Sequence, residues 1–123
     1  MTFLLRTAET EAAYSNFKAS QTDHRNRGLL NNSSDTVVRE FEYWIIIKNN
    51  FPYDAIAVDH DLLVPQRVFG NFAEATEAER AEYETILQTL NDEGYYDSLQ
   101  INFSMNRSVL RHYHIQLLKW KQI

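Results

Sequence analysis

Two histidines and a glutamine occupy alternate positions of the segment 112–116, which reads His-Tyr-His-Ile-Gln near the end of the chain. Successive side chains of an extended strand point to opposite faces of a sheet. His112, His114 and Gln116 are therefore predicted to line one face, while Tyr113, Ile115 and Leu117 pack on the other. This segment concentrates more chemistry on one surface than any other part of the sequence.

Attack on a phosphate is one reaction that these side chains can perform. A neutral imidazole presents a nitrogen lone pair at neutral pH, and the nitrogen–phosphorus bond that it forms is labile, so a second acceptor can discharge it. Such a reaction needs neighbouring donors that hold the phosphoryl oxygens. The polar segment 104–108, just before the histidines, supplies serine, asparagine and arginine side chains for this purpose.

His112, His114 and Gln116 together are called the polar stripe. Two other interpretations of this stripe remain open on spacing alone. Two imidazoles can bind a metal ion, although a third histidine or a carboxylate is missing nearby. Alternation is also common in half-exposed strands, where histidine and glutamine face water at the edge of a sheet.

The rest of the sequence indicates an α+β domain with a mainly antiparallel sheet. Helices are predicted over 8–20 and 76–90, and strands over 60–64, 97–103 and 112–120. The segment 36–48 is rich in β-branched and aromatic residues, and it fits either two strands joined near 40–42 or one bent strand. The polar segment 23–34 is predicted to be a loop and the segment 49–54 a turn.

The second predicted helix has the clearest boundaries. Thr76 is the expected N-cap, Glu79 completes a capping box three residues later, and Gly94 lies soon after the end of the helix. The acidic residues in and before this helix are expected to form a solvated face: Glu74, Glu77, Glu79, Glu82 and Glu84.

Length, composition and charge restrict the class of protein. A chain of 123 residues with 44% hydrophobic residues suits one domain, residues 1–123. No apolar run is long enough to span a membrane, and the first residues do not resemble a secretion signal. The absence of cysteine fits a reducing compartment, so a cytoplasmic location is expected. The net charge of -5 argues against a nucleic-acid partner but allows a small phosphate ligand.

Four segments, in order, resemble the histidine triad (HIT) superfamily. The segment 112–118 resembles the His-φ-His-φ-His-φ-φ motif of that family, where φ is apolar, with glutamine at the third position. The segment 44–54 resembles a family strand that ends in Asn-x-Phe-Pro, and 60–67 resembles His-x-Leu-Leu-Val-Pro-Lys-Arg. Residues 106–109 stand where many members have Gly-Gln-Ser-Val. The resemblance covers about 36–120 and leaves an N-terminal helix and loop over 1–35.

The resemblance implies a HIT-like fold with a mainly antiparallel sheet of about five strands and two helices, often assembled as a homodimer. It implies a nucleotide or dinucleotide as the ligand and no separate cofactor. The middle histidine, His114, would attack an α-phosphate to give a nucleotidyl–histidine intermediate. His112 would orient and polarise it, and the His112 carbonyl would accept the hydrogen on the other ring nitrogen. The implied activity is that of a nucleotide hydrolase or nucleotidyl transferase.

The resemblance also assigns expected roles outside the stripe. Asn49 would line the nucleoside pocket, and Asn102 and Ser108 would donate to phosphate oxygens. Arg107 replaces a glutamine and would add a charged phosphate contact. His60 stands at a family position, although a strand-end histidine that is hydrogen-bonded to a loop is an equally good interpretation.

Gln116 is the departure with the greatest consequence. The transferase branch of the family carries glutamine there, whereas hydrolytic members usually carry histidine. A carboxamide can hydrogen-bond a phosphoryl group but cannot act as an acid near neutral pH. Either the leaving group needs no proton from this residue, or the reaction is slow. The alternative to a hydrolase or transferase is therefore a catalytically weak or inactive nucleotide-binding protein.

Further departures concern metal and spacing. The zinc site of some members is expected to be absent, because the chain has no cysteine and Val68 replaces a histidine. No metal is therefore expected. His112 follows Ser108 by four positions where many members show three, and a one-residue bulge would restore the register.

Overall fold

The structure, a computed structural model, describes residues 5–19, 35–102 and 112–122. Within these ranges a five-stranded sheet has the order β1-β2-β3-β5-β4, and each pair of neighbouring strands is antiparallel. The strands are β1 (Val37–Glu40), β2 (Trp44–Lys48), β3 (Ala57–Pro65), β4 (Ser98–Gln100) and β5 (Ile115–Trp120). The helices are α1 (Ala8–Ala19), the short 3-10 helix η1 (Phe72–Glu74) and α2 (Glu77–Glu93). The prediction of an α+β fold with an antiparallel sheet is confirmed.

The centre of the sheet is buried on both faces. Residues Ile45, Ile46 and Ile47 of β2 pair with Val64, Leu63 and Leu62 of β3 in an unbroken register. Since β-branched and leucine side chains alternate between the faces, each face receives its own apolar cluster. The segment 36–48 thus contains two strands, β1 and β2, rather than the one bent strand that its sequence also allowed.

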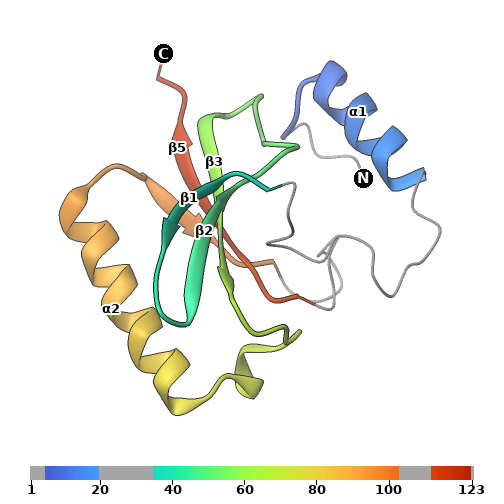
Figure 1. Ribbon diagram of the computed structural model, residues 1–123. Coiled ribbons are helices and arrows are strands. Elements are labelled where there is room, and N and C mark those ends of the chain that lie inside the picture. The colour runs from blue at the N-terminus through green and yellow to red at the C-terminus, as the bar shows by residue number, and fades with distance from the viewer. Residues whose placement is uncertain (1–4, 20–34, 103–111, 123) are drawn as a thin grey trace.

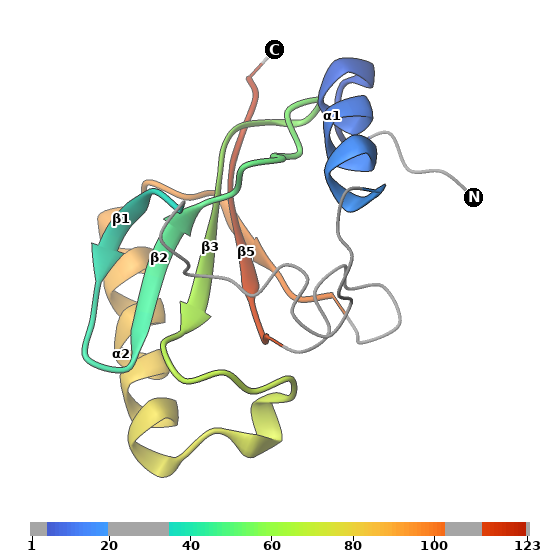
Figure 2. The same cartoon turned by 45° about the vertical axis from the view of Figure 1, so that its right-hand side comes forward.

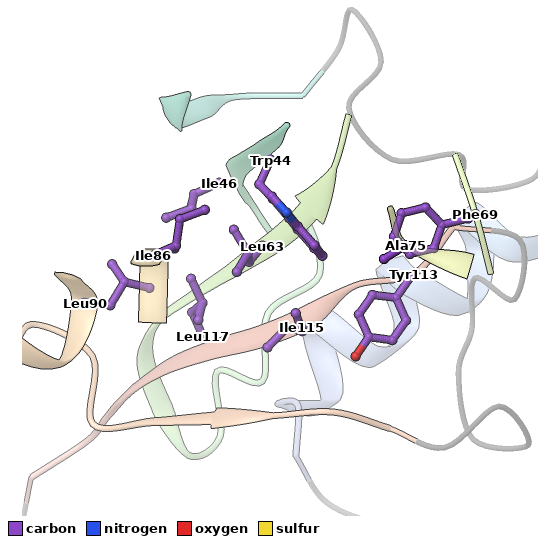
Figure 3. Packing of buried hydrophobic residues seen from close by; sticks show 10 residues of the cluster. All are labelled: Trp44, Ile46, Leu63, Phe69, Ala75, Ile86, Leu90, Tyr113, Ile115 and Leu117. Carbon is purple, nitrogen blue, oxygen red and sulfur yellow. The ribbon is translucent and has the colours of Figure 1, made fainter. Parts of the chain in front are cut away.

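Helix α2 covers one face of the sheet, and α1 lies on the other side, beside the connection between β2 and β3 (Figures 1 and 2). Between α2 and the sheet lies the larger core cluster, in which Ile86 and Leu90 of the helix meet Leu63 and Leu117 of the central strands (Figure 3). Tyr113 and its neighbours extend this cluster beyond the start of β5. The prediction that Tyr113, Ile115 and Leu117 pack on one face is confirmed.

Helix α2 has the predicted caps at both ends. The Thr76 hydroxyl accepts from the Glu79 amide, and the Glu79 carboxylate accepts from the Thr76 amide. Gly94 ends the helix at a φ of 69°, in the left-handed region that glycine tolerates best. The predicted solvated acidic face is wrong for two residues. Glu79 is buried against Arg67, and Glu82 accepts from the backbone amides of the β1–β2 hairpin.

A buried carboxylate also lies on the α2 face. Asp61 is 2% exposed, and its carboxylate accepts a hydrogen bond from the Tyr96 hydroxyl. Its other oxygen lies 3.4 Å from Nζ of Lys48. Because a carboxylate is costly to bury alone, the fold supplies both a donor and an opposite charge.

Helix α1 is attached to the connection between β2 and β3. The Asp54 carboxylate accepts from the Thr7 amide and from the Thr10 hydroxyl at the start of the helix. The rings of Tyr14 and Phe17 pack against Phe51 in tilted arrangements, with ring centroids 5.2 and 5.1 Å apart. The N-terminal segment is thus held by the same connection that leads into β3.

Three predicted strand boundaries differ from the structure. The final strand begins at Ile115 rather than at residue 112, since the Tyr113 amide donates to the Phe69 carbonyl instead of to a neighbouring strand. β3 begins at Ala57, because β5 continues to Trp120 and supplies partners for the extra residues. β4 is shorter than the predicted 97–103. The predicted loop over 23–34 lies outside the described residues.

Candidate active site

The polar stripe lies on the face of the sheet opposite α2. Leu62 of β3 pairs directly with Gln116 of β5, so their side chains share one face. His60 precedes Leu62 by two residues and lies on that same face, diagonally across from Gln116. The pairing of β3 with β5 brings together two residues that are 56 positions apart in the sequence.

Burial excludes the interpretation of the stripe as a water-facing edge. β5 lies between β3 and β4, so it is an interior strand. His112, His114 and Gln116 are exposed by only 1%, 6% and 4%. Buried polar groups need hydrogen-bond partners, and the contacts of these side chains therefore define the site.

His60 is held at both ring nitrogens. The Tyr53 amide donates to Nδ1 at 2.9 Å, which leaves the ring hydrogen of a neutral imidazole on Nε2. That nitrogen contacts Oε1 of Gln116, so His60 donates and the glutamine oxygen accepts. The Tyr53 ring also packs against the His60 ring in a tilted arrangement, with centroids 4.3 Å apart.

Asn49 adds a second donor beside the same imidazole. Its side-chain oxygen accepts from the Phe51 amide at 2.8 Å, which turns its amide nitrogen toward His60. That nitrogen lies 3.4 Å from Nδ1 and 3.3 Å from Nε2. The predicted nucleoside-lining residue thus contacts His60, and the structure brings together these two predicted binding residues.

His114 is oriented by the backbone that precedes it. Its Nδ1 lies 2.9 Å from the carbonyl oxygen of His112. A carbonyl only accepts hydrogen bonds, so Nδ1 carries the hydrogen and Nε2 of the neutral ring keeps its lone pair. A nucleophilic imidazole requires this tautomer.

The His112 ring fixes the start of β5 against the end of β3. Its Nε2 donates to the Pro65 carbonyl at 2.8 Å, and burial lowers the pKa of the ring. A neutral imidazole inside the protein is thereby favoured over an imidazolium. His112 thus positions His114 with its backbone carbonyl while its own ring binds elsewhere.

Burial also keeps His60 neutral. Removal from water lowers its pKa from 6.5 to about 4, and the positive charge of Arg6 and the nearby His114 act in the same direction. The hydrogen bond to Gln116 opposes this shift only in part. At neutral pH the site therefore holds uncharged imidazoles at His60 and His112.

Two contributors to the site were missed by sequence reasoning. The first is the Tyr53 backbone amide, which carries no sequence signal. The second is Arg6, whose Nε donates to the Phe51 carbonyl at 2.7 Å and whose guanidinium lies 5.1 Å from the centroid of the Tyr53 ring. Only the packing of the N-terminal segment on the β2–β3 connection brings Arg6 near the site.

Of the remaining predicted binding residues, the structure describes Asn102 but not Arg107 or Ser108. Asn102 is half-buried just after β4, where its oxygen accepts from Gln100, the residue that pairs with Gln116. Arg107 and Ser108 lie outside the described residues. Within the described ranges, no group of three or more potential metal ligands occurs. None of the helices in the described residues has the length and apolar character needed to cross a membrane.

Comparison with known proteins identifies the fold. No protein-family model matches the sequence, and no curated protein matches it. Among solved structures, one described as a HIT-like protein has a TM-score of 0.55 and 21% identity, over 69% of this chain and 85% of its own. A histidine triad protein from Clostridium difficile has a TM-score of 0.50 and 16% identity, over 72% and 82%.

A third solved structure, a hypothetical histidine triad nucleotide-binding protein from Sulfolobus tokodaii strain7, has a TM-score of 0.52 and 24% identity, over 72% of this chain and 63% of its own. Together with the strand order and the two helices, these similarities define the class: the chain has the HIT-like α+β fold. The expectation of that fold is confirmed.

Proposed function

We propose that the chain binds nucleotides on the face of the sheet that carries the stripe 112–116, and that it transfers a nucleotidyl group through His114. The observation that carries this proposal is the hydrogen bond from Nδ1 of His114 to the His112 carbonyl, which leaves a lone pair on Nε2. The HIT-like fold, and a structural neighbour described as nucleotide-binding, support a nucleotide as the ligand.

The proposed reaction has two steps. The Nε2 lone pair of His114 forms a bond to the α-phosphorus while the bond from that phosphorus to the leaving oxygen breaks, and the electron pair departs with the leaving group. Water, phosphate or another acceptor then attacks the same phosphorus and releases His114 as a neutral ring, with the acceptor's proton passing to solvent. Gln116, Asn102, Arg107 and Ser108 are proposed as donors to the phosphoryl oxygens.

Trapping the intermediate tests the proposal. The protein is incubated with nucleoside triphosphates and dinucleoside polyphosphates that are labelled at the α-phosphate, denatured in alkali to preserve the nitrogen–phosphorus bond, and digested for peptide mapping. We expect acid-labile label on His114 and none on a His114→Ala variant that unfolds at a similar temperature. Absence of both label and product across the panel would exclude the proposed transfer.

A second candidate is a nucleotide-binding protein without turnover, and Gln116 is the residue that favours it. Because a carboxamide supplies no acid, chemistry that needs a proton at the leaving group would stop at binding. Calorimetry separates the two candidates: tight binding without product after long incubation supports the binder, and turnover excludes it.

A further inference from the structure

A second pocket, called the α2-face pocket, lies on the face of the sheet opposite the polar stripe. It has a volume of about 230 Å³ and lies between β1, β2, β3, the last turn of α2 and the segment that follows Gly94. Ile46 of β2 and Leu90 of α2 supply apolar lining (Figure 3). Its lining contains no residue of the polar stripe and none that is proposed to bind the nucleotide. A ligand in this pocket would therefore occupy a separate site.

One buried oxygen atom in the pocket wall needs a hydrogen-bond donor. The Asp61 side chain is buried there, and its Oδ2 accepts from the Tyr96 hydroxyl. Its Oδ1 accepts no hydrogen bond from the described residues. Nζ of Lys48 lies 3.4 Å from Oδ1, which is an ion-pair distance but longer than a normal N–H···O hydrogen bond. Because buried polar atoms are nearly always hydrogen-bonded, Oδ1 indicates a donor that the described residues do not supply.

The charged side chains of the pocket leave one negative charge in excess. The Lys48 ammonium is shared, since Nζ also lies 3.2 Å from Oδ1 of Asp59. Arg39 and Glu93 neutralise each other through two hydrogen bonds of 2.8 and 2.9 Å. The Tyr95 hydroxyl donates to Asp59 and lowers the pKa of that carboxyl, which is therefore charged at neutral pH. The pocket thus favours a positively charged ligand.

The lining of the pocket favours an organic cation over a metal ion. Across the part of the chain that the structure describes, no three potential metal ligands are grouped together. The rings of Tyr95 and Tyr96 stand beside the two carboxylates with centroids 5.1 Å apart, and aromatic faces attract ammonium and guanidinium groups. The volume is below the roughly 300–1,000 Å³ that is typical of pockets for drug-sized ligands, which indicates a smaller molecule.

We propose that the α2-face pocket binds a small organic cation that carries a guanidinium or primary ammonium group on a short alkyl chain. Its N–H groups donate to Oδ1 of Asp61 and to the Asp59 carboxylate, and its chain lies against Ile46 and Leu90. The half-exposed Lys48 competes for the same carboxylates and turns toward solvent when the ligand enters. Because the pocket is on the other face of the sheet, its ligand does not depend on transfer through His114.

Titration of the isotope-labelled full chain with butylguanidinium, followed by NMR, tests the binding. Butylurea is the matched control, since it has nearly the same shape and no charge. We expect saturable shifts of the amide resonances of Ile46, Asp61 and Tyr96, an affinity at least about 10-fold higher for butylguanidinium, and weaker binding at high salt. No saturable shift up to about 10 mM, equal affinity for butylurea, or shifts confined to the polar stripe would overturn the proposal.

Substitutions that change the charge in opposite directions distinguish binding from a general effect on the fold. Asp59→Asn and Asp61→Asn each remove a negative charge, and each should weaken binding at least about 5-fold. Lys48→Met removes the competing ammonium but keeps an unbranched side chain, so it should strengthen binding at least about 3-fold. Glu77→Gln, at the exposed start of α2, removes a charge far from the pocket and should change the affinity by less than about 2-fold.

Thermal unfolding gives a second readout and shows whether each variant is folded. Asp59, whose side chain is 30% exposed, provides the variant that preserves the fold if substitution of the buried Asp61 does not. A ligand that binds the native state raises the melting temperature, so butylguanidinium should raise it for the wild type and Lys48→Met but much less for Asp59→Asn. Weaker binding by Lys48→Met, or equal binding by Asp59→Asn and Glu77→Gln, would overturn the proposal.

A capped Gly-Arg-Gly tripeptide distinguishes a free small molecule from a side chain of a partner protein. The peptide carries the same guanidinium group on a longer chain. We expect it to bind more weakly than butylguanidinium, because the small volume of the pocket leaves no room for the flanking backbone. Binding of the peptide at least about 10-fold more tightly than butylguanidinium would instead assign the pocket to a protein partner and overturn the small-molecule proposal.

Discussion

The buried, neutral state of His60 predicts a specific loss of stability in mild acid. The ring has a pKa of about 4 in the folded protein and about 6.5 in an unfolded chain. Between these values the unfolded state binds a proton that the folded state excludes, so the free energy of unfolding falls as the pH falls. The contribution of His60 is fully present above pH 6.5 and is lost as the pH drops through 4.

The size of the effect follows from the two pKa values. At pH 5 the unfolded histidine is mostly protonated and the folded one is not, which costs about 2 kcal/mol of stability relative to neutral pH. The full difference between the two pKa values corresponds to about 3 kcal/mol near pH 4. For a small domain, a loss of 2 kcal/mol is a large part of the total.

Urea unfolding of the wild type and of His60→Gln at pH 7.5, 6 and 5 measures this term. Other groups also titrate, because His112 and the carboxylates of Asp54, Asp59 and Glu79 have lowered pKa values. They are present in both proteins, so the difference between the two curves isolates His60. We expect the wild type to lose about 2 kcal/mol more than the variant between pH 7.5 and 5. Parallel curves, or a His60 NMR titration centred near 6.5, would refute the reasoning.

Three substitutions test the packing that supports the site. Tyr96→Phe removes the donor to the buried Asp61 and should lower the free energy of unfolding by about 1–3 kcal/mol. Tyr95→Phe, at a more exposed position, should lower it by less. Equal losses in the two variants would contradict the role of Asp61 burial. Thr76→Ala should lower stability by about 1 kcal/mol and Thr76→Ser by little, because serine keeps the capping hydroxyl; similar values for both would argue against the cap. Ile115→Ala creates a cavity at a fully buried position beneath α2 and should lower the free energy of unfolding by roughly 2–5 kcal/mol, measured by thermal or urea unfolding. A loss below about 1 kcal/mol would show instead that the core relaxes around the cavity.

The elements of the fold were predictable because each carries a local signal. Thr76, Glu79 and Gly94 mark the ends of α2, and those ends follow from hydrogen bonds within a few residues of each other. The alternation of 112–116 likewise predicted the two faces of β5. Boundaries were less accurate, since the starts of β3 and β5 depend on which strand supplies partners.

The chemistry of the stripe depended on contacts that no local pattern encodes. From spacing alone, 112–116 was also consistent with a water-facing edge, and the interior position of β5 excluded that interpretation. The same holds for Glu79, which helical periodicity places on a solvated face but which is buried against Arg67. Burial is a property of the assembled sheet and helix, so a single segment does not determine it.

The sequence by itself determined which groups are available: two imidazoles and a carboxamide at alternate positions, in a chain without cysteine. Tertiary structure decided their protonation and direction. The β3–β5 pairing brings His60 to Gln116, and the β2–β3 connection places the Tyr53 amide on the far side of the same ring. A histidine can donate or accept at either nitrogen, and only its partners in the folded chain select one of these states.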